Sequence, residues 1–150
     1  MTVEVLNETN SEVDLQSISQ LATFAMSRMK IHPQADLSII FVDEDSIAEL
    51  NKRWMDETGP TDVLSFPMDE LRPGDDSEVS ADSLLGDIVI CPQVAATQAV
   101  SAGKPVAEEI QLLLVHGFLH LLGFDHAEPA EHQRMFALQD QILAEWRAAA

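Results

Sequence analysis

Three histidines stand close together in the segment HGFLHLLGFDH, residues 116–126. His116 and His120 are four residues apart, so on a helix they lie on one face, one turn apart, where both imidazoles can reach one metal ion. His126 follows six residues later, which is about 600° further around a continuous helix. The three side chains can therefore meet only if the helix ends between the second histidine and the third.

Gly123 is the residue at which this helix can end. A glycine in the left-handed conformation just after a helix closes it with a Schellman turn, and we expect Phe124 to pack back on Leu119 across that turn. The chain then reverses and can bring His126 back to the other two histidines. Three neutral nitrogen ligands leave the fourth tetrahedral position open, which is typical of a catalytic zinc site.

The predicted centre holds one Zn²⁺ per chain, bound by His116, His120 and His126, although nickel, cobalt or iron would also bind imidazoles. Water in the open position of such a site has its pKa lowered toward roughly 7 and becomes a nucleophile at neutral pH. The spacing matches the long zinc-protease motif, but those enzymes carry a glutamate as general base directly after the first histidine. Here that residue is Gly117. The pattern therefore favours a metal-dependent hydrolase that is not a peptidase.

The rest of the chain predicts one α+β domain, residues 1–150, with the metal site on the helix that ends at Gly123. We expect strands at residues 2–6, 37–42, 63–66 and 86–91. We expect helices at residues 15–29, from Asp43 or Asp45 to about 54, at 92–101, from 106 into the histidine segment, and at 129–147. The elements do not alternate strictly, which indicates a small mixed sheet of about four strands packed with about five helices. Pro67 is expected to end its strand or to place it at a sheet edge.

Composition limits the classes of function. The chain has 150 residues, one cysteine and a net charge of −18, so it cannot form an internal disulfide and it repels polyanions at long range. Any binding of nucleic acid must therefore depend on a local site. The N-terminal residues lack the pattern of a signal peptide, and the longest apolar stretch is too short to span a bilayer. We expect a cytoplasmic protein without membrane association. The acidic segment 69–83 is expected to be a solvated loop or, alternatively, a mobile lid.

Three motifs together resemble the bacterial YbeY family of metal-dependent endoribonucleases. They are the histidine segment, GPTDVLSFP at residues 59–67 and LGDIVIC at residues 85–91. They follow the order of the family, and the resemblance extends from about Leu37 to Ala144. It implies a zinc-dependent single-strand endoribonuclease that acts in the maturation of the 3′ end of small-subunit rRNA and in ribosome quality control. The implied partners are ribosomal RNA and the ribosome or its small-subunit proteins.

One position departs from the pattern of that family. Many members carry an arginine after the aromatic residue of the helix that precedes the second motif. Here the aromatic residue is Trp54 and the next residue is Met55, which cannot hold a phosphate. Arg53 is a candidate catalytic residue, but it lies two positions before the family's arginine, about 200° around the helix.

Further candidates have two possible roles each. Asp125, beside His126, is a candidate catalytic residue that can orient an imidazole or move a proton, or it only forms a turn. Lys52, Asp62 and Ser65 are candidate substrate contacts, but Lys52 can also be a solvated surface charge. Asp62 and Ser65 can also cap a helix and a strand. The sequence does not choose between attack by a metal-bound water and attack by the neighbouring 2′-hydroxyl of RNA.

Two hypotheses of function follow. The first is a zinc-dependent endoribonuclease, which the open coordination position favours. The second is a metal-stabilised ribosome-assembly factor that binds rRNA or a ribosomal protein without cleavage. The acidic composition favours the second hypothesis, because an acidic surface complements basic ribosomal proteins. The sequence leaves the oligomeric state open.

Overall fold

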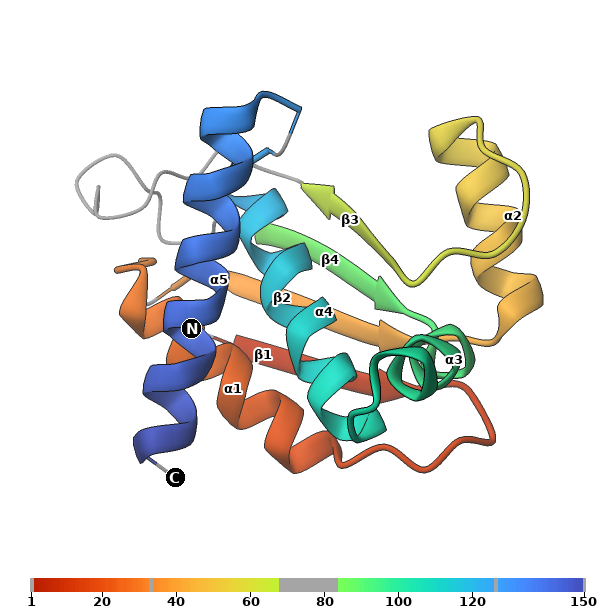
Figure 1. Ribbon diagram of the computed structural model, residues 1–150, viewed down its shortest axis with the longest axis horizontal. Helices are drawn as coiled ribbons and strands as arrows, with labels where there is room; N and C mark the ends of the chain where they lie inside the picture. Colours follow the sequence, from red (N-terminus) through yellow and green to blue (C-terminus); the bar gives the residue numbers. More distant parts are fainter. Residues whose placement is uncertain (1, 33, 68–83, 126, 150) are drawn as a thin grey trace.

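The computed structural model describes residues 2–32, 34–67, 84–125 and 127–149. Within these ranges it contains a four-stranded sheet and five helices (Figure 1). In chain order they are β1 (Thr2–Asn7), α1 (Leu15–Arg28), β2 (Asp36–Phe41), α2 (Glu44–Met55), β3 (Val63–Pro67), β4 (Leu84–Ile90), α3 (Pro92–Ala102), α4 (Val106–Leu121) and α5 (Pro129–Ala149). The predicted α+β class is confirmed, and the predicted ends of the elements agree with these bounds to within two residues.

The sheet is mixed. Its strand order is β1-β2-β4-β3, with β1, β2 and β4 parallel and β3 antiparallel to β4. β3 ends at Pro67 and lies at one edge of the sheet. The proline is expected from the sequence either to end its strand or to place it at an edge, and it does both. An edge strand tolerates proline because the missing N–H faces away from the ladder.

Apolar residues cover both faces of the sheet unequally. In β2, Leu37, Ile39 and Phe41 belong to a large cluster with residues of α1, α3, α4 and α5, which we call the main core. Ile40, on the other face, packs against a smaller cluster that we call the minor core. The minor core consists of Val42, Ile47, Leu64, Val89 and Cys91. Figure 1 shows α1, α4 and α5 across one face of the sheet and α2 apart from them beside β3.

The end of α4 has the geometry expected from its glycine. Gly123 has a φ of 93°. Its N–H donates to the carbonyl of His120 at 3.0 Å, and the N–H of Phe124 donates to the carbonyl of Leu119 at 3.1 Å. These two hydrogen bonds define a Schellman turn, and Phe124 packs against the main core, to which Leu119 belongs. The helix therefore ends at Leu121, and the chain reverses at Gly123, three residues after His120.

Two expectations concern residues outside the described ranges. The acidic segment 69–83, expected to be a loop or a lid, is one of them, and His126 is the other. None of the described helices is both long enough and apolar enough to cross a bilayer.

Candidate active site

The two histidines of α4 face each other at close range. The Nε2 atoms of His116 and His120 are 3.1 Å apart, and the two rings lie at 80° to each other. Both side chains are half-buried. Two nitrogens that bind one zinc ion tetrahedrally, at roughly 2.0–2.1 Å each, are separated by about 3.3 Å. The spacing of the pair is therefore close to the one that a shared metal ion requires.

A glutamine from α5 orients the first of these histidines. Gln139 is only 2% exposed, and its Oε1 lies 2.9 Å from Nδ1 of His116. Because an amide oxygen can only accept, this contact holds the proton on Nδ1 and leaves the lone pair of Nε2 directed toward His120. Our sequence reasoning missed Gln139. The available signal was a polar residue within the apolar stripe of Met135 and Ile142 on the same helix.

A pocket of about 460 Å³ opens beside the two histidines. Its lining residues are Met55, Asp62, Val63, Leu64, Ser65, Pro67, His116 and His120. We call it the histidine pocket. It brings the end of α2, strand β3 and helix α4 together. Two of the three candidate substrate contacts, Asp62 and Ser65, line this pocket, and so does Met55, which stands at the position of the family's arginine.

Asp62 and Ser65 also have structural roles. The hydroxyl of Ser65 donates to the carbonyl of Gly117 at 2.9 Å and so joins β3 to α4. The carboxylate of Asp62 accepts hydrogen bonds from the N–H of Val63 at 2.7 Å and from Nε2 of Gln98 at 3.2 Å. These contacts set the start of β3 against α3. Each residue therefore serves the fold and lines the pocket at the same time.

Gly117 lies where α4 approaches the sheet most closely. A Cβ added there would lie 3.0 Å from Cγ2 of Ile88, 3.0 Å from Oγ of Ser65 and 3.2 Å from Cγ2 of Val63. This position faces the sheet and leaves no room for a side chain. The absence of a protease-type glutamate therefore has a packing reason, in addition to the chemical consequence expected from the sequence.

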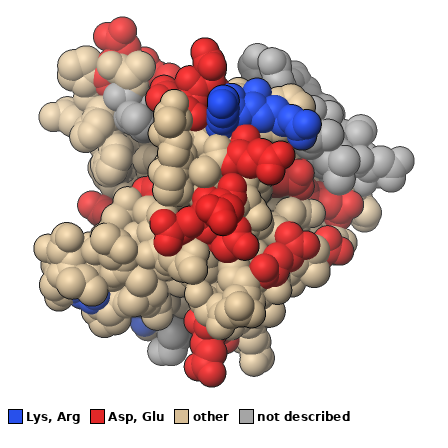
Figure 2. Space-filling view, turned by 90° about the vertical axis from the view of Figure 1, so that its right-hand side faces the viewer, with Lys and Arg blue, Asp and Glu red and all other residues tan. Residues whose placement is uncertain are grey.

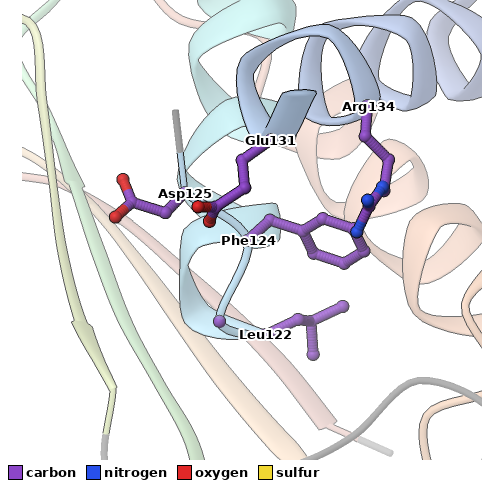
Figure 3. A pocket seen from close by; sticks show the side chains of 6 residues that line it. Leu122, Phe124, Asp125, Glu131 and Arg134 are labelled. Atoms are coloured by element: carbon purple, nitrogen blue, oxygen red, sulfur yellow. The ribbon is translucent and has the colours of Figure 1, made fainter. Parts of the chain in front are cut away.

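The structure does not bring the remaining candidates to the histidine pocket. Lys52 and Arg53 lie in the last turn of α2 with exposed side chains, and neither lines the pocket. Asp125 lines a separate cavity of about 220 Å³ with Phe124, Arg134 and other residues. Figure 3 shows its carboxylate pointing away from Phe124 and Arg134.

The third expected metal ligand, His126, lies outside the described residues. In the ranges that the structure covers, no three His, Cys, Asp or Glu side chains are grouped so that they could hold a metal ion. The described part of the expected centre is thus the pair of His116 and His120, with Gln139 behind it.

The surroundings of the pocket carry little positive charge. Its described lining contains no lysine or arginine and includes the carboxylate of Asp62. On the side of the molecule that carries α2 and α3, acidic side chains spread over the middle of the surface, with a small group of cations above them (Figure 2). Long-range attraction of phosphates is therefore weak on this side.

Comparisons with known proteins identify the family. A family model described as Endoribonuclease YbeY matches residues 4–147. Endoribonuclease YbeY from Nocardioides sp. is 55% identical over 148 residues, which cover 99% of each chain. The protein of the same name from Clavibacter sepedonicus is 58% identical over 143 residues, 95% of this chain and 94% of that one.

A solved structure supports the same fold. A solution structure from Thermotoga maritima superimposes with a TM-score of 0.62 at 24% sequence identity, covering 98% of this chain and 93% of that one. At this identity the likeness concerns the fold alone. The family model and the curated relatives cover nearly the whole chain, and they confirm the resemblance carried by its three motifs. The chain therefore belongs to the YbeY family of endoribonucleases, enzymes that cleave RNA.

Proposed function

We propose that this chain is a zinc-dependent endoribonuclease that cleaves single-stranded RNA during maturation of the 3′ end of small-subunit rRNA. Family membership supports the class of reaction. The observation that best supports a metal site is the distance of 3.1 Å between Nε2 of His116 and Nε2 of His120, in the wall of a pocket of about 460 Å³. We also propose a cytoplasmic location, a role in ribosome quality control, and small-subunit proteins as partners.

The donor set of the pocket suits a zinc ion. Imidazole nitrogens are common zinc ligands, and the ligands proposed here are His116, His120 and His126. When bound, a zinc ion would supply a Lewis acid for a phosphate oxygen and an activated water. Gly117, directly after the first proposed ligand, packs against the sheet and supplies no general base.

The residues around the pair keep the site in shape. Gln139 holds the proton of His116 on Nδ1, so that Nε2 remains available as a ligand. The hydrogen bond from Ser65 to the carbonyl of Gly117 holds β3 against α4 and so maintains the width of the pocket. Asp125 directly precedes His126 in the chain and stays our candidate for orienting that imidazole or moving a proton.

Single-turnover cleavage of an rRNA 3′-end precursor by metal-quantified protein tests the proposal. Cleavage should follow the zinc content and vanish in His116→Ala. The matched control is His32→Ala, because His32 does not line the histidine pocket; this variant should cleave normally. No cleavage by fully metallated protein, either alone or with ribosomes, would contradict the proposal.

The attacking group can be identified in the same assay. A substrate with 2′-deoxyribose at the cleaved nucleotide lacks the internal nucleophile but keeps the phosphodiester. If cleavage stops, the neighbouring 2′-hydroxyl attacks phosphorus and the product carries a cyclic phosphate. If cleavage continues, water attacks.

A second candidate function is supported by the acidic surface in Figure 2. A ribosome-assembly factor that does not cleave would use this surface to bind a basic ribosomal protein. His116→Ala separates the two candidates, because it should abolish cleavage but leave such binding intact. A pull-down of small-subunit proteins with wild-type and His116→Ala protein measures this difference.

A further inference from the structure

Trp54 is an unusually exposed aromatic residue near the end of α2. Its side chain is 62% exposed. Its ring is nevertheless held in place by Phe66 of β3, with the ring centroids 6.4 Å apart and the planes at 76°. This edge-to-face arrangement is a favourable geometry for an aromatic pair. The indole is therefore oriented by the protein while most of its surface stays in solvent.

The aromatic pair adjoins the histidine pocket. Met55, the residue after Trp54, lines the pocket. Ser65 and Pro67, the two neighbours of Phe66 in β3, line it as well. Side chains alternate along a strand, so Phe66 packs on the face of the minor core while Ser65 faces α4. The aromatic pair therefore lies on the α2 side of β3, next to the wall that Met55 forms. A strand of RNA with a phosphodiester in the pocket would pass close to this wall.

The charge of the site makes an uncharged contact valuable. The described lining of the pocket lacks lysine and arginine, and the chain has a net charge of −18, so a phosphate in the pocket meets no positive side chain among these lining residues. The nearest cations along the chain are Lys52 and Arg53, which are exposed in the last turn of α2. Stacking of a nucleobase on an aromatic ring needs no positive charge and accepts every base. Proteins that bind single strands commonly combine a groove for the backbone with such a ring.

We propose that Trp54, supported by Phe66, stacks an unpaired base of the RNA substrate beside the histidine pocket. The inference rests on the proposed function, since it takes single-stranded RNA as the substrate. Exposed tryptophans also act as anchors in protein interfaces, so a second copy of the chain is the alternative occupant. We favour a base because the ring adjoins the pocket in a family of RNA-cleaving enzymes.

Binding of a short, labelled single-stranded RNA measures the contribution of the ring. Trp54→Ala should weaken binding about 5- to 150-fold, the range for one stacked base, and Trp54→Phe should fall between this variant and the wild type. The matched control is Trp146→Phe, which changes the other tryptophan, on α5 against the main core. This control should bind like the wild type. The ratio of the Trp54→Ala and wild-type affinities should stay constant as salt rises, because stacking is not ionic.

Fluorescence reports the contact directly. The chain has two tryptophans, so in the Trp146→Phe protein all tryptophan emission comes from Trp54. Titration with single-stranded RNA should quench this emission, whereas a sugar-phosphate strand without bases should not.

Each outcome has a distinct meaning. Equal RNA affinity of wild type and Trp54→Ala, or no quenching, overturns the stacking proposal even if the wild type cleaves RNA. The proposal is also overturned if the wild type does not bind RNA, or if sedimentation shows that Trp54→Ala dissociates a dimer. Quenching and weakened binding without any cleavage by wild-type protein would support stacking and contradict the proposed enzyme.

Discussion

The main core and the minor core lie on opposite faces of the same sheet and differ in how completely helices cover them. The main core joins residues of α1, α3, α4 and α5 to the sheet, whereas the minor core contains five buried residues, one of which is Ile47 of α2. At the end of α2 the cover is incomplete, because Trp54 and Met55 are 62% and 40% exposed. The histidine pocket opens there. A closed face supports the fold, and the thinly covered edge beside it is where a substrate can enter.

Removing a large side chain from the main core should have the largest effect on stability. Leu114 on α4 is 1% exposed, so Leu114→Ala should lower the free energy of unfolding by about 2–5 kcal/mol, through lost burial and a cavity. Leu50→Ala, at a half-buried residue against the minor core, should cost roughly 1 kcal/mol. Urea unfolding of both variants measures the contrast, and equal losses would show that the two faces contribute alike.

Loss of the hydrogen bond between His116 and Gln139 should weaken metal binding more than it lowers the free energy of unfolding. Gln139→Leu keeps the size of the side chain but removes the acceptor for the Nδ1 proton. Loss of such a contact typically weakens metal affinity about 10- to 100-fold, which chelator competition with zinc can measure. The matched control is Gln133→Leu, an exposed glutamine on the same helix. Unchanged zinc affinity in Gln139→Leu would show that this hydrogen bond does not orient His116 for metal binding.

Two glycines of the histidine segment should respond differently to alanine. At Gly117 the new Cβ meets three neighbours at 3.0–3.2 Å, so overpacking outweighs the gain in helix propensity and we expect a net loss of about 1 kcal/mol with reduced cleavage. At Gly123 nothing lies within 4 Å but φ is +93°. There the loss of about 1–2 kcal/mol comes from backbone strain alone. Urea unfolding and cleavage assays should show which substitution displaces the histidines.

The smallest effect concerns the ion pair between α1 and α5. Nε of Arg28 donates to Oε1 of Glu145 at 2.8 Å, and this hydrogen bond lowers the pKa of the carboxyl. Because the folded pKa lies below the unfolded one, the stabilisation is present above the unfolded pKa and is lost as the pH falls through the folded pKa.

Thermal unfolding as a function of pH tests this expectation. The curves of wild type and Glu145→Gln should differ slightly near neutral pH and converge in acid. Arg28→Gln should behave in the same way as Glu145→Gln. A difference between wild type and variant that persists in acid would exclude the ion pair as its source.

Local features of this chain were predictable from its sequence. The strand at 63–67, the helix that starts at Pro92 and the Schellman turn at Gly123 follow from residue types within one or two turns. The pairing of His116 with His120 follows from helical spacing. Helical periodicity also predicts that Lys52 and Arg53 belong to α2. It does not predict which residue at the end of this helix lines the histidine pocket, and the structure shows that Met55 does so and Arg53 does not.

The sequence by itself determined where helices begin and end and which histidines share a helical face, because backbone hydrogen bonds and side-chain spacing within a few residues control both. Only the tertiary structure decided what surrounds them. The contact of His116 with Gln139 joins residues 23 positions apart, and that of Ser65 with Gly117 joins residues 52 apart. Such contacts depend on how α5 and β3 pack on α4, and packing is a property of surfaces that distant parts of the chain form together.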